Sequence, residues 1–270
     1  MTFLNENTKE SLLKKLINQI NEESVNNLSI IPFACPIISF GDYKKSIVAT
    51  MGLNPSDREF LDVSGKELDG NHRRFHTLNS LDLRNWAKAS TQDLSYIEKS
   101  CENYFSNKPY YPWFRDMQNI ILATGFSFYK NNACHLDLIP YATRIKWANL
   151  SKHNKNSLLD LSRTSLLDTL VNSKIKLIVL NGKSVVDGFE RLTNIKFKTE
   201  VMIDWRLPQK NNKYVERYSY MSKINNSNFP NLNRDILILG FNHNLQSSFG
   251  VSSQVKNSIK QWVARSFKGD

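Results

Sequence analysis

The sequence has little cysteine and no long apolar run. Its three cysteines, Cys35, Cys101 and Cys134, are isolated and form no C-x-x-C pair. Because a structural zinc or an iron–sulfur cluster needs four ligands, we expect reduced core cysteines and neither a metal nor a cofactor. No apolar run approaches the roughly 18 residues of a membrane span, and the opening segment MTFLNENTKE lacks a signal-peptide core. These absences predict a cytoplasmic protein without a membrane partner.

Several catalytic signatures are incomplete. Gly182-Lys183-Ser184 resembles the end of a phosphate-binding loop, but Leu177 occupies the position of its first glycine. The helix expected to begin here could still meet a DNA phosphate through its backbone amides. His72 and His76 have the spacing of metal ligands but no third partner, and no G-x-S-x-G elbow is present. The sequence therefore disfavours nucleotide hydrolysis, metal chemistry and serine hydrolysis.

Positive charge is in excess. Lysine and arginine number 36 against 25 for aspartate and glutamate, which gives a formal net charge of +11. An excess of this kind favours polyanionic partners, nucleic acid first. The alternative is a lysine-rich surface that only keeps the protein in solution.

Apolar segments alternate with helical patterns along the chain. Strands are predicted at 46–53, 133–139, 175–180 and 235–240, and helices at 114–124, 158–171, 183–192 and 255–267. This order predicts a single α/β domain over residues 1–270, a three-layer α/β/α sandwich with a central four-stranded parallel sheet. Residues 1–30 are expected to form a helical extension, and residues 204–234 a basic, aromatic-rich insertion.

The first predicted strand ends in a rigid turn, Gly52-Leu53-Asn54-Pro55-Ser56. The proline donates no ladder hydrogen bond and holds Asn54 in an extended conformation. Asn54 thus comes at the carboxyl end of a strand, where open α/β sheets place their chemistry. The last predicted strand runs in the same way into Phe241-Asn242-His243-Asn244-Leu245-Gln246-Ser247-Ser248.

These two segments resemble the two motifs of the uracil-DNA glycosylase superfamily, and the resemblance covers roughly residues 46–265. It implies that Asn54 positions the attacking water, with Asp57 or Glu59 as the base. It also implies that His243 donates a hydrogen bond to O2 of the departing base. The expected partner is double-stranded DNA, and we expect the protein to act as a monomer. Alternatively, Asn54 only caps a turn, and His243 is a structural histidine at a strand end whose hydrogen bonds are satisfied within the protein.

The second predicted strand departs from the superfamily pattern. Where relatives carry an asparagine that reads the pyrimidine edge, this chain has Asp137. A carboxylate would repel O4 of uracil, but it accepts well from the N4 amino group of cytosine. Ser56 is smaller than the aromatic residue of uracil-specific members, so a substituent at position 5 of the ring would fit. Alternatively, Asp137 binds a structural arginine or the backbone.

Together these departures resemble a branch of bacterial anti-phage glycosylases that excise glucosylated 5-hydroxymethylcytosine from phage DNA. We therefore predict a monofunctional DNA glycosylase that flips out and hydrolytically excises a modified cytosine-type base, leaving abasic sites as antiviral defence. The alternatives are a uracil or deaminated-base repair glycosylase and a catalytically silent nucleic-acid-binding relative.

Further residues are candidates for contact with the flipped base and with the DNA backbone. Phe75 or Phe60 is expected to stack on the flipped base, and Leu245 or Gln246 to fill the space that the base leaves. The expected contacts to the DNA backbone are Ser247, Ser248, Arg73, Arg74, Arg144 and Lys183. Solvated surface charges are the alternative for the basic residues.

Overall fold

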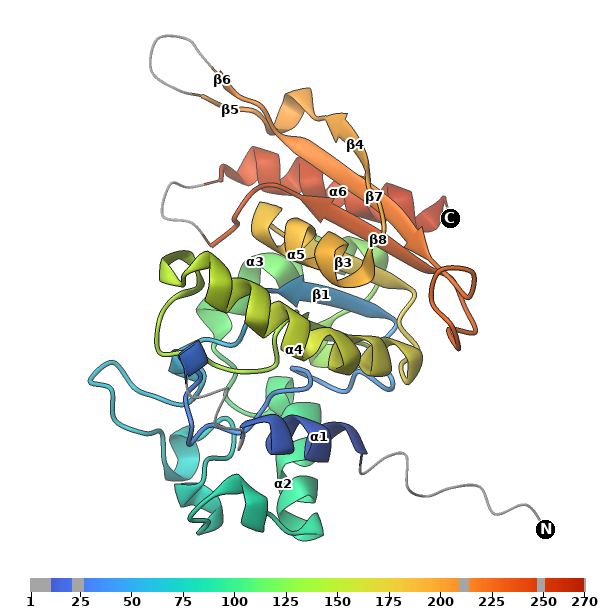
Figure 1. Ribbon diagram of the computed structural model, residues 1–270. Helices are drawn as coiled ribbons and strands as arrows, with labels where there is room; N and C mark the ends of the chain where they lie inside the picture. The colour runs from blue at the N-terminus through green and yellow to red at the C-terminus, as the bar shows by residue number, and fades with distance from the viewer. Residues whose placement is uncertain (1–10, 21–26, 209–213, 247–250, 270) are drawn as a thin grey trace, which may run out of the picture.

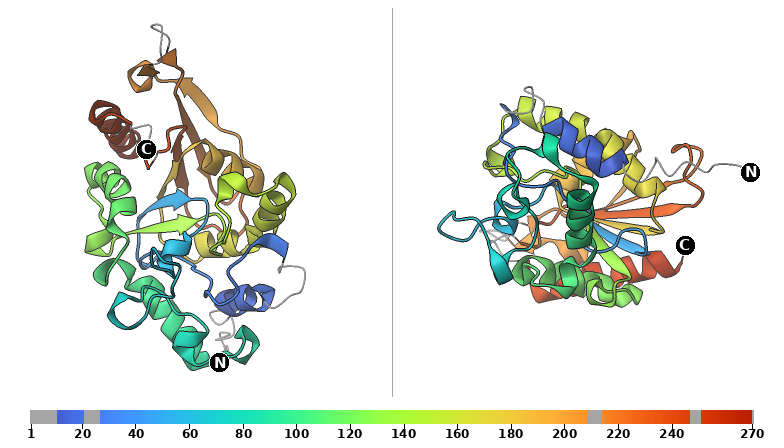
Figure 2. Two further views of the ribbon diagram at one scale, coloured as in Figure 1. Left: turned by 90° about the vertical axis from the view of Figure 1, so that its left-hand side faces the viewer. Right: turned by 90° about the horizontal axis from the view of Figure 1, so that it is seen from below.

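Six strands form one mixed sheet with helices on both faces (Figures 1 and 2). The computed structural model describes residues 11–20, 27–208, 214–246 and 251–269. Four strands run parallel in the order β2 (Ala133–Asp137), β1 (Val48–Gly52), β3 (Leu177–Asn181) and β8 (Ile236–Phe241). Every residue of β1, β3 and β8 is buried, as expected where helices cover both faces of parallel strands. The four strands predicted from the sequence are therefore present.

The sheet is wider than predicted. β7 (Tyr218–Ile224) pairs antiparallel with β8, and β4 (Lys198–Val201) pairs antiparallel with β7. The prediction of a four-stranded, all-parallel sheet is therefore wrong. The whole segment 204–234 is predicted from the sequence to be an insertion, because its lysine, serine and tyrosine side chains obscure a strand pattern, yet β7 lies within it. The structure uses part of that segment to extend the sheet beyond β8.

Helices cover the two faces in pairs. α3 (Tyr111–Ile121) and α6 (Ser253–Lys268) pack together on one face, while α4 (Lys152–Val171) and α5 (Lys183–Thr193) cover the other (Figure 2). α1 (Ser11–Ile20) lies against α4. The arrangement gives the predicted order of layers, helices on either side of a central sheet.

One further helix and two short strands lie outside these layers. α2 (Thr91–Glu102) lies in a stretch for which no helix was predicted. β5 (Leu207–Pro208) and β6 (Tyr214–Val215) form a separate two-stranded hairpin, which projects from the body of the protein (Figure 1). This hairpin therefore adds no strand to the central sheet.

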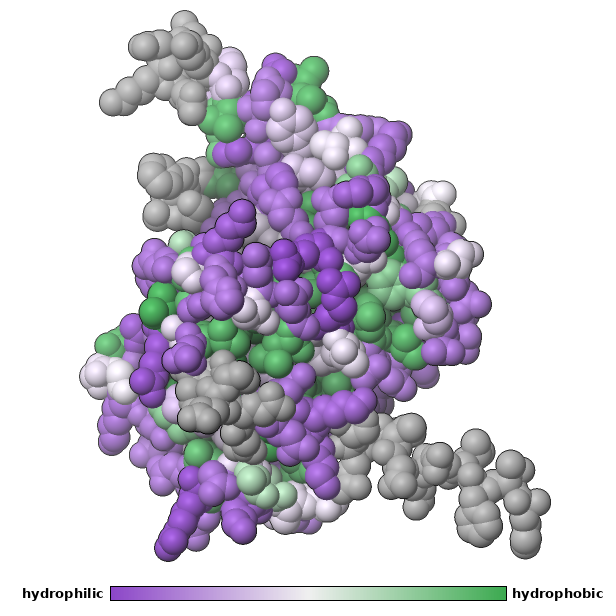
Figure 3. All heavy atoms as spheres, viewed as in Figure 1, coloured by the Kyte–Doolittle hydropathy of each residue, from purple (hydrophilic) through white to green (hydrophobic). Residues whose placement is uncertain are grey.

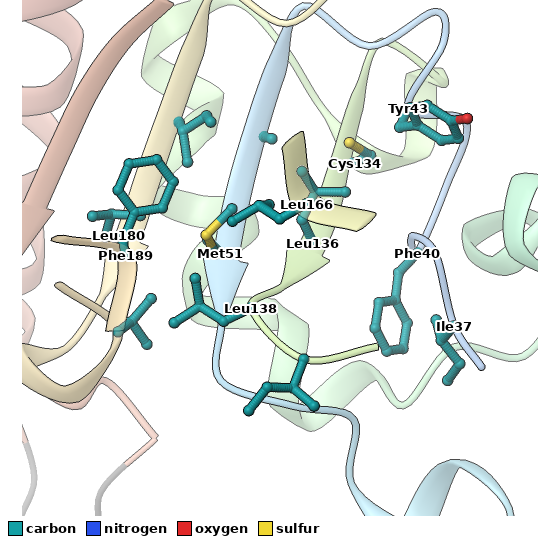
Figure 4. Close-up of a cluster of buried hydrophobic side chains, with 14 of the residues drawn as sticks. Ile37, Phe40, Tyr43, Met51, Cys134, Leu136, Leu138, Leu166, Leu180 and Phe189 are labelled. Carbon is teal, nitrogen blue, oxygen red and sulfur yellow. The ribbon is translucent and has the colours of Figure 1, made fainter. Parts of the chain in front are cut away.

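The core beneath α4 and α5 is apolar. Met51, Leu136 and Leu180 extend from the sheet toward Leu166 of α4 and Phe189 of α5 (Figure 4), and all five side chains are at most 4% exposed. Burying a side chain of this size contributes roughly 1.5–3 kcal/mol to stability. This packing fixes the strands, and so fixes where their carboxyl ends meet.

Candidate active site at the carboxyl edge of the sheet

A cavity of about 440 Å³ lies at the carboxyl edge of the parallel strands. Residues 52–54 form one wall, residues 181–185 a second, and Asn242, Asn244 and Gln246 a third, with Trp113 of α3 beside them. The volume falls within the roughly 300–1,000 Å³ of pockets that hold small molecules. The two motif segments identified in the sequence thus meet at one opening.

Asn54 lines this cavity with its amide held in a defined orientation. Its Nδ2 donates to the Pro55 carbonyl oxygen and to Thr143 Oγ1, each at 3.1 Å. The Thr143 hydroxyl itself donates to Ile145 O at 2.7 Å, so its oxygen must accept from Asn54. Both amide hydrogens are therefore used, and Oδ1 is left as an acceptor without a partner among the described residues. An acceptor fixed in this way can orient a water molecule, although it cannot take a full proton.

Asp137 ends β2 beside Gly52, its partner in the register of β1 and β2. Asp137 Oδ1 lies 3.3 Å from His135 Nε2, and His135 Nδ1 lies 2.7 Å from Thr50 Oγ1. A Cβ atom on Gly52 would lie 2.4 Å from Asp137 Oδ1, so β1 requires glycine where it passes this carboxylate. The partner of Asp137 is thus a histidine rather than a structural arginine.

The Asp137 carboxylate adjoins the cavity without lining it. Its side chain is 4% exposed, and it lies against Gly52, which is part of the cavity wall. Asp137 also borders a separate void of about 10 Å³ between β2, α1 and α4, which has room for no more than a single water molecule. Contact between Asp137 and a ligand in the larger cavity therefore requires the ligand to approach over Gly52.

Glu59 is a buried carboxyl group whose pKa is affected by the charge of Asp137. It is 3% exposed, accepts a hydrogen bond from Tyr104 Oη at 2.8 Å, and lies 4.0 Å from Arg74 Nε. Burial raises the pKa of Glu59 to about 7, although the Tyr104 hydrogen bond and the Arg74 charge oppose the shift; the nearby Asp137 charge adds to it. Glu59 can therefore hold or release a proton near neutral pH.

The other candidate base, Asp57, lies in a half-buried turn outside the cavity lining. Ser56 is exposed, donates to Asp57 Oδ1 at 3.0 Å, and caps the following turn by accepting from Arg58 N at 3.2 Å. Ser56 was expected to leave room at position 5 of a bound ring. Ser56 does not line the cavity, so the cavity gives that expectation no support.

His243 is turned away from the cavity, contrary to the prediction. The residue is 1% exposed, and its Nε2 donates a hydrogen bond to Trp205 O at 2.9 Å. Nδ1 is buried and has no partner among the described residues. Burial, assisted by the charge of Arg217, lowers the pKa of His243 to about 4, so the ring is neutral at pH 7. Asn242 and Asn244, on either side of it, line the cavity instead.

Phe60 and Phe75 are not at the cavity either. Each is 1% exposed, in an aromatic cluster with Tyr104 and its neighbours. The ring of Phe75 stacks on Tyr104 with 5.1 Å between ring centroids. Both rings are packed against protein, so neither is placed to stack on a base in this cavity as the structure stands.

The two residues predicted to fill the space left by a flipped base, Leu245 and Gln246, have side chains that pack within the protein or line the cavity. Leu245 is 3% exposed. Gln246 lines the cavity, where its Oε1 accepts from Asn181 Nδ2 at 2.7 Å and its Nε2 donates to Trp113 O at 3.2 Å. Neither side chain projects as a wedge into DNA would. Ser247 and Ser248 lie outside the described residues.

The predicted cationic contacts fall into different environments. Lys183 lines the cavity and forms an ion pair with Asp187. Arg73 and Arg144 are exposed. Arg74 donates to Arg58 O at 2.7 Å and to Lys108 O at 3.0 Å, so it ties two loops together rather than reaching for a phosphate. Hydrophilic residues also predominate on the face formed by α4 and α5 (Figure 3).

Two further properties concern only the described part of the chain. None of its helices combines the length and apolarity that crossing a bilayer would require. No three histidine, cysteine, aspartate or glutamate side chains within it come together as ligands for a metal ion.

No model of a known protein family matches the sequence, and no curated protein similar to it is found.

Several residues of this region were missed in the sequence. His135 and Asp137 are two apart on a predicted strand, so a shared face was available as a signal. Asn181 is the last residue of β3 and comes directly after the strand predicted at 175–180, so its place at a strand end was a signal of the same kind. Trp113 lay in an apparent aromatic turn, and its approach to the cavity depends on how α3 packs, which no local pattern indicates.

Proposed function

We propose that this protein is a DNA glycosylase that hydrolyses the N-glycosidic bond of an extruded cytosine-type nucleotide. The observation that carries the proposal is the unpaired Oδ1 of Asn54, on a residue lining a cavity of about 440 Å³ at the carboxyl edge of a parallel sheet. The net charge of +11 supports a nucleic-acid partner. A base inside a duplex is out of reach of any such cavity, so the nucleotide must be flipped out first.

The chemistry needs a positioned water and a stabilised leaving group. The C1′–N1 bond breaks with its electron pair leaving on the base, through an oxocarbenium-like sugar. Asn54 Oδ1 orients the water that forms the new C1′–O bond, and the proton lost by that water neutralises the departing base. Lys183 and the first backbone amides of α5 line the cavity and favour the negative charges of the nucleotide. Glu59, with a pKa of about 7, is the nearby carboxyl group best suited to exchange a proton.

The identity of the base follows from Asp137. A carboxylate at the Gly52 wall suits the N4 amino group of cytosine and opposes O4 of uracil. The resemblance to anti-phage glycosylases extends the proposal to a 5-substituted cytosine such as the glucosylated hydroxymethyl form, excised as antiviral defence. With Ser56 outside the cavity, that extension is supported by the resemblance alone.

Excision from defined duplexes tests the proposal. Duplexes carrying one cytosine, hydroxymethylcytosine, glucosylated hydroxymethylcytosine or uracil are incubated with the protein, and abasic sites are cleaved with alkali. We expect strand breaks at a cytosine-type base, and a fall of about 100-fold in rate for Asn54→Ala, since one oriented group typically contributes that much. Asn149→Ala, which changes an exposed asparagine that does not line the cavity, serves as the control. Breaks at uracil alone would instead indicate a repair glycosylase.

A second candidate is a nucleic-acid-binding relative without catalysis. The orientation of His243 favours it, because a neutral ring that donates to Trp205 O makes no contact with a base in the cavity. Duplex binding in a gel-shift assay, with no strand break on any of the four substrates, would support this function and reject the glycosylase.

A further inference from the structure

A row of buried polar side chains lies directly behind the Gly52 wall of the cavity. Thr50 pairs with His135 and Gly52 with Asp137 in the register of the parallel strands β1 and β2. Because side chains two apart on a strand share a face, Thr50, His135 and Asp137 all project on the same side. The row is therefore built by strand register and does not depend on a loop conformation.

The row has one consistent direction of hydrogen bonding for an ionised Asp137 beside a neutral His135 ring. A carboxylate only accepts, so His135 Nε2 carries the hydrogen that it shares with Asp137 Oδ1 at 3.3 Å. Nδ1 of the neutral ring is then an acceptor, and the Thr50 hydroxyl donates to it at 2.7 Å. The Asp137 carboxylate thus selects the tautomer of His135 that donates to it, and the Thr50 hydroxyl supports that tautomer by donating to Nδ1.

The imidazole ring cannot readily turn. It is 1% exposed and makes ring contacts with Phe40, Trp113 and Phe114, at centroid distances of 5.5, 4.8 and 5.3 Å. A Cβ on Gly52 would lie 3.0 Å from His135 Nε2, so β1 closes the remaining side. Trp113 also lines the cavity, so the imidazole ring of His135 lies between the protein core and a residue of the cavity wall.

We propose that His135 is a positioning residue, which engages Oδ1 of Asp137 and so reserves Oδ2 for the amino group of a pyrimidine. This inference rests on the proposed function and deepens it. In the described part of the chain no donor hydrogen-bonds Oδ2. A carboxylate that could rotate freely would lose this discrimination, because either oxygen could then turn away from the O4 of uracil. Fixing one oxygen makes a uracil in the same pose face an unpaired acceptor, which is the kind of mismatch that gives strong selection.

Kinetic discrimination provides the first test. We expect His135→Leu to lower the ratio of kcat/KM for the cytosine-type base over uracil by about tenfold, as loss of one oriented hydrogen bond does. His135→Gln places an amide N–H near the position of Nε2 and is expected to restore most of the ratio. Thr50→Val, which is nearly isosteric, should lower the same kcat/KM ratio by about threefold. This variant provides the test if His135→Leu fails to fold. His153→Gln, on an exposed face of α4, is the control. An unchanged ratio in both His135→Leu and Thr50→Val would overturn the role.

A spectroscopic measurement separates failure of this inference from failure of the proposed function. In nitrogen NMR spectra of the full chain, the His135 signal, identified by its loss in His135→Gln, should report a hydrogen on Nε2 alone. Deoxycytidine should shift this signal and deoxyuridine should not. That result in a protein that excises no base would reject the glycosylase and retain the positioning role. Excision accompanied by equal shifts with both nucleosides, or by none, would retain the glycosylase and reject the positioning role.

Discussion

Two buried polar clusters lie next in sequence or in space to residues that line the cavity, and they differ in how fully their atoms are paired. The first, which we call the strand cluster, comprises Thr50, Glu59, Tyr104, His135 and Asp137. The second, which we call the loop cluster, comprises Trp205, Arg206, Arg217 and His243. Hydrogen bonds of 2.7 to 3.3 Å join the members of the strand cluster in two sets. In the loop cluster, Arg206 Nε, Arg217 Nε and His243 Nδ1 are buried without a partner among the described residues.

The difference follows from what holds each cluster. Strand register fixes Thr50, His135 and Asp137, whereas the loop cluster joins the segment after β8 to the base of the β5–β6 hairpin. A buried polar atom without a partner costs about 1–3 kcal/mol. The strand cluster is therefore a preorganised part of the site, and the loop cluster is the side more easily rearranged.

Replacing Gly52 should break the strand cluster and have the largest effect. In Gly52→Ala the new Cβ would meet Asp137 Oδ1 at 2.4 Å, so the carboxylate or the strand must move. We expect a loss of about 1–3 kcal/mol of stability in urea titrations, as for other overpacked sites. Excision should also fall by at least about 100-fold, because a displacement of this kind misaligns the base.

Gly240→Ala is the matched control, since its Cβ would meet Val186 Cγ2 at 2.8 Å in an apolar part of the core. It should cost stability without changing base preference. Normal stability and excision in Gly52→Ala would show that Asp137 is not held against β1.

Glu59→Gln should remove a pH dependence that belongs to the strand cluster. The folded pKa of about 7 lies above the ordinary 4.5, so the folded state keeps a proton that the unfolded state loses. Ionisation of Glu59 should therefore lower the stability of the wild type by about 3 kcal/mol as pH rises from about 4.5 to 7, and titration of His243 acts in the opposite direction over much of this range. The glutamine variant cannot ionise, so this fall should be absent from its urea midpoints. Glu200→Gln, exposed on β4, should retain the wild-type slope, and the same slope in Glu59→Gln would contradict the assignment.

The strand cluster was more accessible from sequence than the loop cluster, for a physical reason. Apolar runs predicted all four parallel strands, and the rule that strand ends carry function then placed Asn54 and Asp137 near one another. The direction of His243 could not be predicted, because residues 242–246 follow no period that tells one face from the other. β7 and β4 were missed because Lys198, Tyr218 and Lys223 give them a polar composition that is typical of loops.

His243→Gln should expose the opposite pH dependence of the loop cluster. The folded pKa of about 4 lies below the ordinary 6.5, so the wild type loses stability as pH falls from about 6.5 to 4. We expect a loss of about 1–2 kcal/mol, since local opening of the segment lets the ring take a proton before global unfolding. Glutamine can still donate to Trp205 O, and its urea midpoints should lack the acid fall. A large loss of excision in this variant would show that the ring turns into the cavity when DNA binds.

Arg217→Met should have the smallest effect, confined to the loop cluster. The guanidinium disfavours a charged imidazole, so its removal should raise the pKa of His243. The rise should be less than about half a unit, because Arg217 is partly exposed and solvent screens its charge. Titration of the His243 ring by NMR measures the shift, with Arg73→Met, an exposed arginine of another loop, as the control. Stability should stay near that of the wild type, since the variant also removes the unpaired Nε. A fall in the His243 pKa would mean that Arg217 supports this ring through packing rather than opposing its charge.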